Sequence, residues 1–321
     1  MDLRLLGPLY MGWALGTNDV ANIFGTAVSS FMVRYRTAVA LAAIFVLLGA
    51  LYGGNRGMVT LSALTSQTYN TAFIISLAAA ITVTLMTFLE LPVSTSQAVV
   101  GAIIGIGITN RQVDTTPLIK ILICWITTPL GACVISIVLY IILSDIIRKK
   151  AIHFMTYDRL IRNLLILSGI YGAYSLGANN VANVTGVFYR SGILDIKQSL
   201  FIGGIGISLG ALTANKGVIF TVGRRIVPVD AFSAFIAVLA HSITLHIYAH
   251  IGVPISSSHA IVGAVFGIGL IKGTRTVNKK TIFKVLSGWF FTPVAGMFFC
   301  LILYYLFCQS QDNLIYCSFQ K

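Results

Sequence analysis

The sequence predicts an all-α integral membrane protein with about ten transmembrane spans, arranged as two inverted-topology repeats. Hydrophobic residues make up 57% of the 321 residues, charged residues only 10%, and the mean hydropathy is +0.89. Soluble domains carry about 25% charged residues, so this composition excludes an ordinary globular protein. Two polar motifs each occur twice in the chain, at offsets of 161 and 162 residues. A polar cluster repeated within two apolar halves is typical of a transport site between membrane repeats.

About ten apolar runs are long enough to cross roughly 30 Å of hydrocarbon. They lie near residues 6–30, 37–54, 71–89, 93–108, 121–143, 164–190, 198–214, 231–250, 255–271 and 282–306. The shorter stretches 57–69 and 217–227 are candidates for additional short or re-entrant segments. An odd number of spans in each half turns the second copy over in the membrane, which gives an inverted repeat. The predicted division is a first membrane repeat at 1–143, a basic connecting loop at 144–163, a second repeat at 164–306 and a C-terminal tail at 307–321.

The formal charge of +13 lies in the connections between the apolar runs. Fifteen of the 22 Lys and Arg residues fall on the side that holds the 144–163 loop. The positive-inside rule then predicts a cytoplasmic 144–163 loop and both termini outside. The expected surroundings are the lipid bilayer of the plasma or cytoplasmic membrane, and no nucleic-acid partner is expected.

The first motif, Gly-Thr-Asn-Asp-Val-Ala-Asn at residues 16–22, recurs as Gly-Ala-Asn-Asn-Val-Ala-Asn at residues 177–183. Asp19 is the only carboxylate well inside an apolar run. A charge at the bilayer centre costs about 2.5–3.5 kcal/mol on insertion scales, and a bound cation or a proton would offset that cost. Gly and Asn tolerate non-helical backbone, so the motif predicts a broken helix whose free carbonyls join Asp19 and Asn22 in a sodium site. Buried hydrogen bonds between two helices are the alternative.

The second motif, Leu-Pro-Val-Ser-Thr-Ser-Gln at residues 91–97, recurs as Val-Pro-Ile-Ser-Ser-Ser-His at residues 253–259. Proline ends a helix, and Ser94 followed by Gln97 has the spacing of a capping box at a new helix start. Free N–H groups and hydroxyls at such a start bind anions without any Lys or Arg. A simple turn at the membrane surface is the alternative.

Other residues carry weaker signals. His246 and His250 have i, i+4 spacing with His241 nearby, so a metal pair is conceivable, although no carboxylate or thiol accompanies them. Glu90 is a candidate for proton handling. The chain has no nucleophile–base constellation and few carboxylates, so an enzyme is not expected, and neither is an organic cofactor. A passive channel remains an alternative to a carrier.

The duplicated motifs resemble those of the inorganic phosphate transporter (PiT) family over nearly the whole chain. The resemblance implies a secondary active transporter that takes up inorganic phosphate by symport with Na+ or H+ through alternating access. It also implies arsenate as a phosphate mimic, frequent homodimers, and no bound metal beyond Na+. The coupling-ion residues that it implies are Asp19, Asn22, Asn180 and Asn183. The substrate-binding residues that it implies are Asn18, Asn22, Ser94, Thr95, Ser96, Gln97, Asn179, Asn183, Ser256, Ser257, Ser258 and His259.

Three positions depart from the family pattern. Asn180 stands where many members have a second aspartate, Val46 where many have a glutamate, and Gln97 where histidine is frequent. These departures remove negative charge and a titratable group, so we expect fewer coupled cations per phosphate. The family includes sulfate permeases, and sulfate is the alternative substrate. Asp19 favours phosphate, because a protonated phosphate donates a hydrogen bond to a carboxylate and sulfate has no proton to donate.

Overall fold

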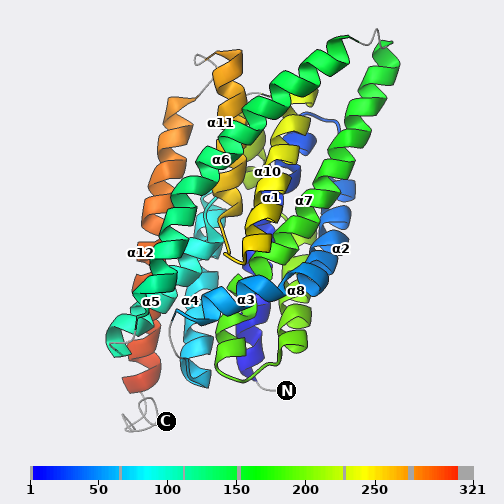
Figure 1. Ribbon diagram of the computed structural model, residues 1–321. Helices are drawn as coiled ribbons and strands as arrows, with labels where there is room; N and C mark the ends of the chain where they lie inside the picture. Colours follow the sequence, from blue (N-terminus) through cyan, green and yellow to red (C-terminus); the bar gives the residue numbers. More distant parts are fainter. Residues whose placement is uncertain are drawn as a thin grey trace.

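The computed structural model is a bundle of helices and describes residues 3–64, 67–110, 113–149, 153–226, 229–273 and 278–309 (Figure 1). The helices in chain order are the 3-10 turn η1 (Leu3–Leu5), α1 (Leu6–Ser29), α2 (Tyr35–Gly53), α3 (Asn55–Ser62), α4 (Tyr69–Phe88), α5 (Thr95–Asn110), α6 (Thr115–Arg148), α7 (Phe154–Arg190), α8 (Ile196–Leu212), α9 (Lys216–Phe220), the π-helical turn η2 (Thr221–Arg225), α10 (Ala231–Ile251), α11 (Ser257–Lys272) and α12 (Lys279–Gln309). No strand occurs in these ranges. The all-α class is therefore confirmed, and each of the ten predicted apolar runs coincides with a helix.

Five of these helices are long and apolar enough to cross a membrane by length and composition. They are α2, α4, α6, α10 and α12. A sixth candidate is the pair formed by α8 with the α9–η2 segment, which is bent by 76°. Helices α5 and α11 have only 16 residues each, about 24 Å at 1.5 Å per residue, and α1 and α7 carry the polar first motif. Length and composition alone therefore support five or six spans among the described residues, and not the ten that were predicted.

Two helices extend into the segment that was predicted to be the loop between the two halves. Within the expected loop 144–163, α6 runs on to Arg148 and α7 begins at Phe154. Arg148, Arg159 and Arg162 lie on exposed helix surface, and an ion pair joins Asp145 to the capping residue Lys149 at 2.6 Å. The stretches 57–69 and 217–227 contain the short helices α3 and α9–η2, and Figure 1 shows α3 lying across the long helices.

The second motif begins a helix in both halves, as predicted. Helix α4 ends at Phe88 and α5 begins at Thr95, while α10 ends at Ile251 and α11 begins at Ser257. Each break contains one residue in the left-handed region, Glu90 with φ 57° and Gly252 with φ 79°.

The predicted break at the first motif is wrong. Helices α1 and α7 are continuous through residues 16–22 and 177–183. The glycines of the motif serve close helix packing, because a Cβ on Gly16 would lie 2.2 Å from the backbone oxygen of Ile207, and one on Gly177 would lie 2.0 Å from that of Val46. The conformational freedom of glycine was the wrong reason for its presence here.

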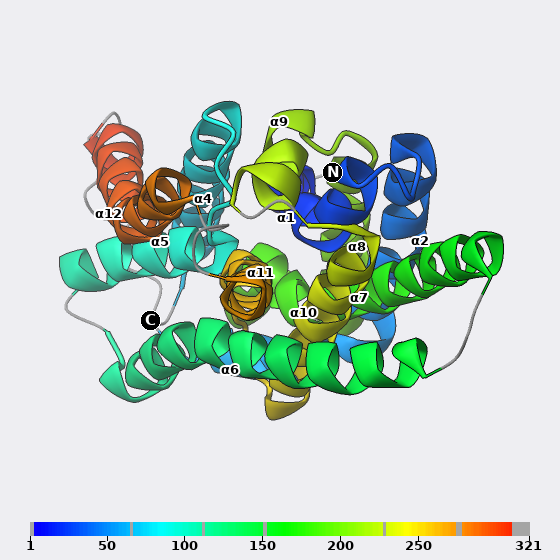
Figure 2. The same cartoon turned by 90° about the horizontal axis from the view of Figure 1, so that it is seen from above.

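The main helix contacts join a helix of the first half of the chain to a helix of the second half. Helix α1 packs against α8 and α2 against α7, while α5 packs against α12 and α6 against α11. Figure 2 shows α4, α5 and α12 on one side, α2 and α8 on the other, and α10 and α11 between them. The same pairing appears at atomic detail: a Cβ on Gly101 would lie 2.1 Å from the Pro293 oxygen, and one on Gly263 would lie 2.2 Å from the Pro129 oxygen. These two glycines therefore allow close helix packing between the halves.

Candidate functional site

The four copies of the two motifs meet in the interior of the bundle. Helix α1 contacts α7 and α11, and α7 contacts α5, so all four motif-bearing helices are joined. Helices α1 and α7 are antiparallel, with Gly7 beside Phe188 at one end and Ile23 beside Gly172 at the other. The two copies of the first motif lie between these contacts and therefore at the same depth.

Every residue predicted at the site is buried, with at most 6% of its surface exposed. These residues are Asn18, Asp19, Asn22, Ser94, Thr95, Ser96, Gln97, Asn179, Asn180, Asn183, Ser256, Ser257, Ser258 and His259. The second motif therefore lies inside the protein and not in a turn at its surface.

Asn18 and Asn179 hold the helix breaks in place. The Asn18 amide donates to Thr87 Oγ1 at 2.8 Å and to the Leu91 carbonyl at 3.0 Å, and its oxygen accepts from the Val93 N–H at 3.3 Å. In the second half, Asn179 donates to the Ile255 carbonyl at 3.0 Å and accepts from its N–H at 3.3 Å. These amides are occupied by protein, so each fixes a motif-two segment beside a motif-one helix.

Serine caps begin α5 and α11. Ser94 Oγ accepts from the Gln97 N–H, and Ser256 Oγ accepts from the His259 N–H, both at 3.2 Å. Ser94 also shares a hydrogen bond with Ser96 at 3.1 Å, and Ser256 shares one with Ser258 at 3.0 Å. The predicted capping by Ser94 is confirmed, and Ser256 caps α11 in the same way. The reciprocal bond of a capping box is not formed, because Gln97 Oε1 has no protein partner. Both starts also carry hydroxyls and free N–H groups at the positive end of a helix dipole.

Asp19 joins the two motifs of the first half. Its Oδ2 accepts a hydrogen bond from Thr95 Oγ1 at 3.1 Å, while Oδ1 is buried without a protein partner. Asn180, at the equivalent position, instead accepts from Asn183 at 2.8 Å. The halves thus share a backbone arrangement and differ in charge.

Buried polar atoms without a protein partner concentrate at the motifs. Among the described residues they include Asp19 Oδ1, both amide atoms of Asn22, Asn180 Nδ2, Asn183 Oδ1, Gln97 Oε1 and His259 Nε2. Buried polar atoms in native structures are nearly always paired, so these atoms are available to pair with a ligand. The oxygens suit a hard monovalent cation, and the amide and hydroxyl groups suit an anion. The residues present therefore fit a coupling cation beside an oxyanion.

The sequence did not identify His241 as part of this region. Its ring is fully buried on α10, and Nε2 lies 3.0 Å from Ser257 Oγ. Ser257 is equivalent to Thr95, so a histidine contacts the hydroxyl in the second half where an aspartate does so in the first. The signal in the sequence is weak, because His241 is a single polar residue within an apolar run and its nearest histidines, His246 and His250, lie downstream.

His259 is held by two tryptophan-bearing helices. Its Nδ1 lies 3.1 Å from the Trp125 carbonyl on α6, and its ring centroid lies 3.8 Å from that of Trp289 on α12. These contacts fix the ring orientation at the start of α11 and leave Nε2 as the free nitrogen.

Two further candidates lie outside the buried motif cluster, namely Glu90, which directly precedes the second motif, and the pair His246 and His250. Glu90 forms an ion pair with Arg225 of η2 at 2.6 Å, and both side chains are about half exposed. The rings of His246 and His250 are 4.5 Å apart and line a cavity of about 340 Å³ that Arg56 also lines. Among the described residues no group of three potential metal ligands occurs. The arginine disfavours a cation in this cavity.

Residues 15–300, which include all four motif copies, match the family described as the phosphate transporter family. The chain belongs to this family. It is accordingly a multi-pass membrane transporter and not an enzyme.

Relatives in this family carry related names. A protein of Methanocaldococcus jannaschii named "Putative phosphate permease" is 32% identical over 303 residues, covering 94% of this chain and 96% of the relative. The sulfate permease CysP of Bacillus subtilis is 26% identical over 314 residues, covering 95% of this chain and 88% of the relative. The fold is similar to that of a solved sodium-dependent phosphate transporter, with a TM-score of 0.87, 22% identity, and coverage of 96% of this chain and 98% of the other.

Proposed function

We propose that this protein takes up inorganic phosphate by symport with sodium through alternating access. The observation that carries the proposal is the concentration of buried, unpartnered oxygen and amide atoms where the four motif copies meet. A proton is the alternative coupling ion, and Asp19 is the group that would carry it.

The cation site centres on Asp19 and Asn22 of α1. An aspartate in the interior of a membrane protein is costly unless a cation or proton compensates its charge. One Asp19 oxygen is held by Thr95, so the free oxygen and the Asn22 oxygen are left to coordinate an ion. Asn183 offers a further oxygen from the second half, and Asn180 has no charge. We therefore propose fewer coupled cations than in members with two aspartates.

The phosphate site lies at the starts of α5 and α11. The hydroxyls of Ser96, Ser257 and Ser258 and the first N–H groups of both helices supply donors, while the Thr95 hydroxyl donates to Asp19. No Lys or Arg belongs to either motif, so the anion is held by dipoles, hydroxyls and the neighbouring cation. Binding of the two ions is thereby coupled, because each offsets the charge of the other.

Alternating access is supported by the pairing of helices between the halves. A duplicated unit in opposite orientation adopts two arrangements that are related by the pseudo-two-fold axis in the membrane plane, around a fixed central site. The ten runs and the distribution of basic residues support an orientation with both termini outside. A homodimer remains an expectation from the family.

Sulfate is the second candidate, and the Bacillus subtilis relative is the observation that favours it. Asp19 supports phosphate, since its free oxygen accepts a hydrogen bond from a phosphate hydroxyl. The two anions are separated by uptake of labelled phosphate into proteoliposomes, with arsenate and sulfate as competitors and with sodium or proton gradients applied separately. Accumulation under a sodium gradient, blocked by arsenate and not by sulfate, is the expected result. Uptake blocked by sulfate alone would assign the protein to sulfate transport, and equilibration without accumulation would make it a channel.

A further inference from the structure

One face of α7 leads from the buried motif to the end of the helix. Asn183, Val187 and Arg190 are spaced i, i+4 and i+7 and therefore lie on the same face. Asn183 is 2% exposed and Val187 is 4% exposed, while Arg190 is exposed in the last turn. The polar cluster is thus connected to the surface along a single helix face.

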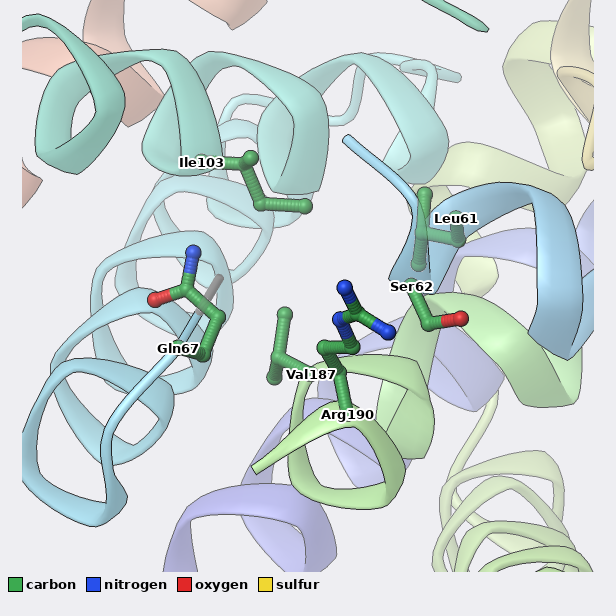
Figure 3. A pocket seen from close by; sticks show the side chains of 6 residues that line it. All are labelled: Leu61, Ser62, Gln67, Ile103, Val187 and Arg190. Carbon is green, nitrogen blue, oxygen red and sulfur yellow. The ribbon is translucent and has the colours of Figure 1, made fainter. Parts of the chain in front are cut away.

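Arg190 lines a recess at this end of the bundle, which we call the Arg190 recess. The residues that line it are Leu61, Ser62, Gln67, Ile103, Val187 and Arg190. Figure 3 shows the Arg190 side chain extending between Val187 and Ser62 toward the space that Ile103 and Gln67 border. The recess is too narrow to admit water, so the passage is closed in this conformation.

Three buried apolar side chains close the passage. Leu61, Val187 and Ile103 are 1%, 4% and 2% exposed, and Leu61 packs against Gly186 of α7. Ile103 lies seven residues after Ser96 on α5, so the second wall also leads back to the buried cluster. Separation of α3 from α5 and α7 would therefore open a path to the motifs.

The charge at the recess suits an anion. None of its lining residues is acidic, and Arg190 forms no ion pair within the described part of the chain. The planar Arg190 guanidinium carries paired N–H donors, which match two oxygens of a tetrahedral oxyanion.

The equivalent end of α1 differs. Asn22, Thr26 and Ser29 have the same spacing and lead to a cavity of about 450 Å³ that Arg224 and Asp230 line. There the Arg224 Nε–H donates to the Ser29 carbonyl at 2.8 Å, and a carboxylate is present. The cationic, acid-free mouth is therefore a property of the α7 end alone.

We propose that Arg190 is a capture residue for a tetrahedral oxyanion at the mouth of one access route, and that Leu61, Ile103 and Val187 form the apolar gate of that route. The inference rests on the proposed transport of phosphate for its ligand. Arg190 raises the local concentration of the anion before the gate opens, and it does not contribute to the buried site itself.

The test measures local charge with thiol reagents and requires no transport. Val187→Cys is introduced after the five native cysteines are replaced by alanine. Membrane-impermeant anionic and cationic methanethiosulfonates of similar size are applied to each side of the membrane. We expect reaction from one side only, with the anionic reagent faster. A unit charge about 8 Å away in water gives about a five-fold ratio between reagents of opposite charge. Arg190→Gln should abolish this ratio, whereas Arg190→Lys should keep it.

Matched controls separate the alternatives. Thr26→Cys at the α1 end should be insensitive to Arg190→Gln, and Leu61→Cys replaces the first probe if Val187→Cys fails to fold. No reaction at either gate position from either side would overturn the access route. A ratio that Arg190→Gln leaves unchanged would overturn the role of the arginine.

Uptake distinguishes this inference from the proposed function. Arg190→Gln should raise the KM for phosphate about five-fold with an unchanged maximal rate, and high salt should remove the difference from wild type. If the wild type transports sulfate and not phosphate, the reagent ratios still decide the role of Arg190 for that oxyanion. In that case the assignment of phosphate as the substrate is wrong, and the role of Arg190 is still tested.

Discussion

Replacing Asp19 by asparagine removes the one carboxylate of the motifs and preserves the shape of the side chain. Asp19 is fully buried, with one oxygen bonded to Thr95 and the other without a protein partner. For a monovalent cation about 4 Å away at an effective dielectric constant of about 20, the lost attraction is about 4 kcal/mol, or about a thousandfold in affinity. We therefore expect Asp19→Asn to lose sodium-coupled uptake at ordinary sodium concentrations.

Misfolding would not explain that loss. A charged side chain in a membrane interior costs about 2.5–3.5 kcal/mol on insertion scales, so the neutral variant should insert and resist heat at least as well as the wild type. Thermal unfolding in detergent and labelled uptake across a sodium titration measure the two effects separately. Thr95→Val is the matched control, because it removes a hydrogen bond to the carboxylate and keeps the charge. It should raise the sodium concentration for half-maximal uptake by only about tenfold.

The double variant Asp19→Asn/Asn180→Asp moves the carboxylate to the equivalent position in the second half. Partial recovery of coupled uptake is expected if both positions face one site. Asn180→Asp alone should increase the charge moved per phosphate, which the reversal potential in proteoliposomes reports. Normal uptake with wild-type sodium dependence in Asp19→Asn would refute the placement of the cation, whatever the other variants do.

Four further substitutions have expected outcomes that differ between the site, the packing and the surface. Ser96→Ala and Ser258→Ala each remove a hydroxyl donor and should raise the KM for phosphate about two- to tenfold with little change in maximal rate, which uptake kinetics measures. Gly101→Ala places a Cβ 2.1 Å from the Pro293 oxygen and should destabilise the protein by about 1–3 kcal/mol, seen as a lower unfolding temperature; an unchanged temperature would contradict the packing. Lys149→Ala breaks only an exposed ion pair, so it should change stability by less than about 0.5 kcal/mol and leave uptake unchanged.

The second motif could be predicted from sequence in detail. Proline, a capping serine and a polar residue three positions later constrain local backbone strongly, so the starts of α5 and α11 were predicted within a residue or two. The apolar runs were equally informative, since burial in a membrane requires them. An apolar run does not determine how long its helix is: α5 and α11 are helices as predicted, but with 16 residues each they are too short to count as spans by length.

The first motif shows where sequence reasoning fails. Glycine and asparagine have two physical uses in a helix, namely access to unusual backbone and close contact with a neighbour. Only the tertiary structure distinguishes them: Gly16 contacts the backbone of α8, and Asn18 bonds across to the α4–α5 break. Both uses produce the same residue pattern. His241 was missed for a related reason, because its partner Ser257 is contributed by another helix.

The duplicated scaffold and the unequal charges explain different parts of the proposed cycle. Features that repeat are geometric: the serine caps, the asparagine ties at Asn18 and Asn179, and the glycine contacts all occur in both halves. Symmetry of this kind gives the two access states similar energies, which a carrier needs in order to alternate between them. Asp19 and His241, which bear the titratable groups nearest the motif hydroxyls, have no counterpart in the other half. In the proposed cycle, the substrate and its coupling ion would therefore meet different chemical groups on the two sides of one site. Ion binding beside Asp19 would then control release, while the geometry that both access states share would stay the same.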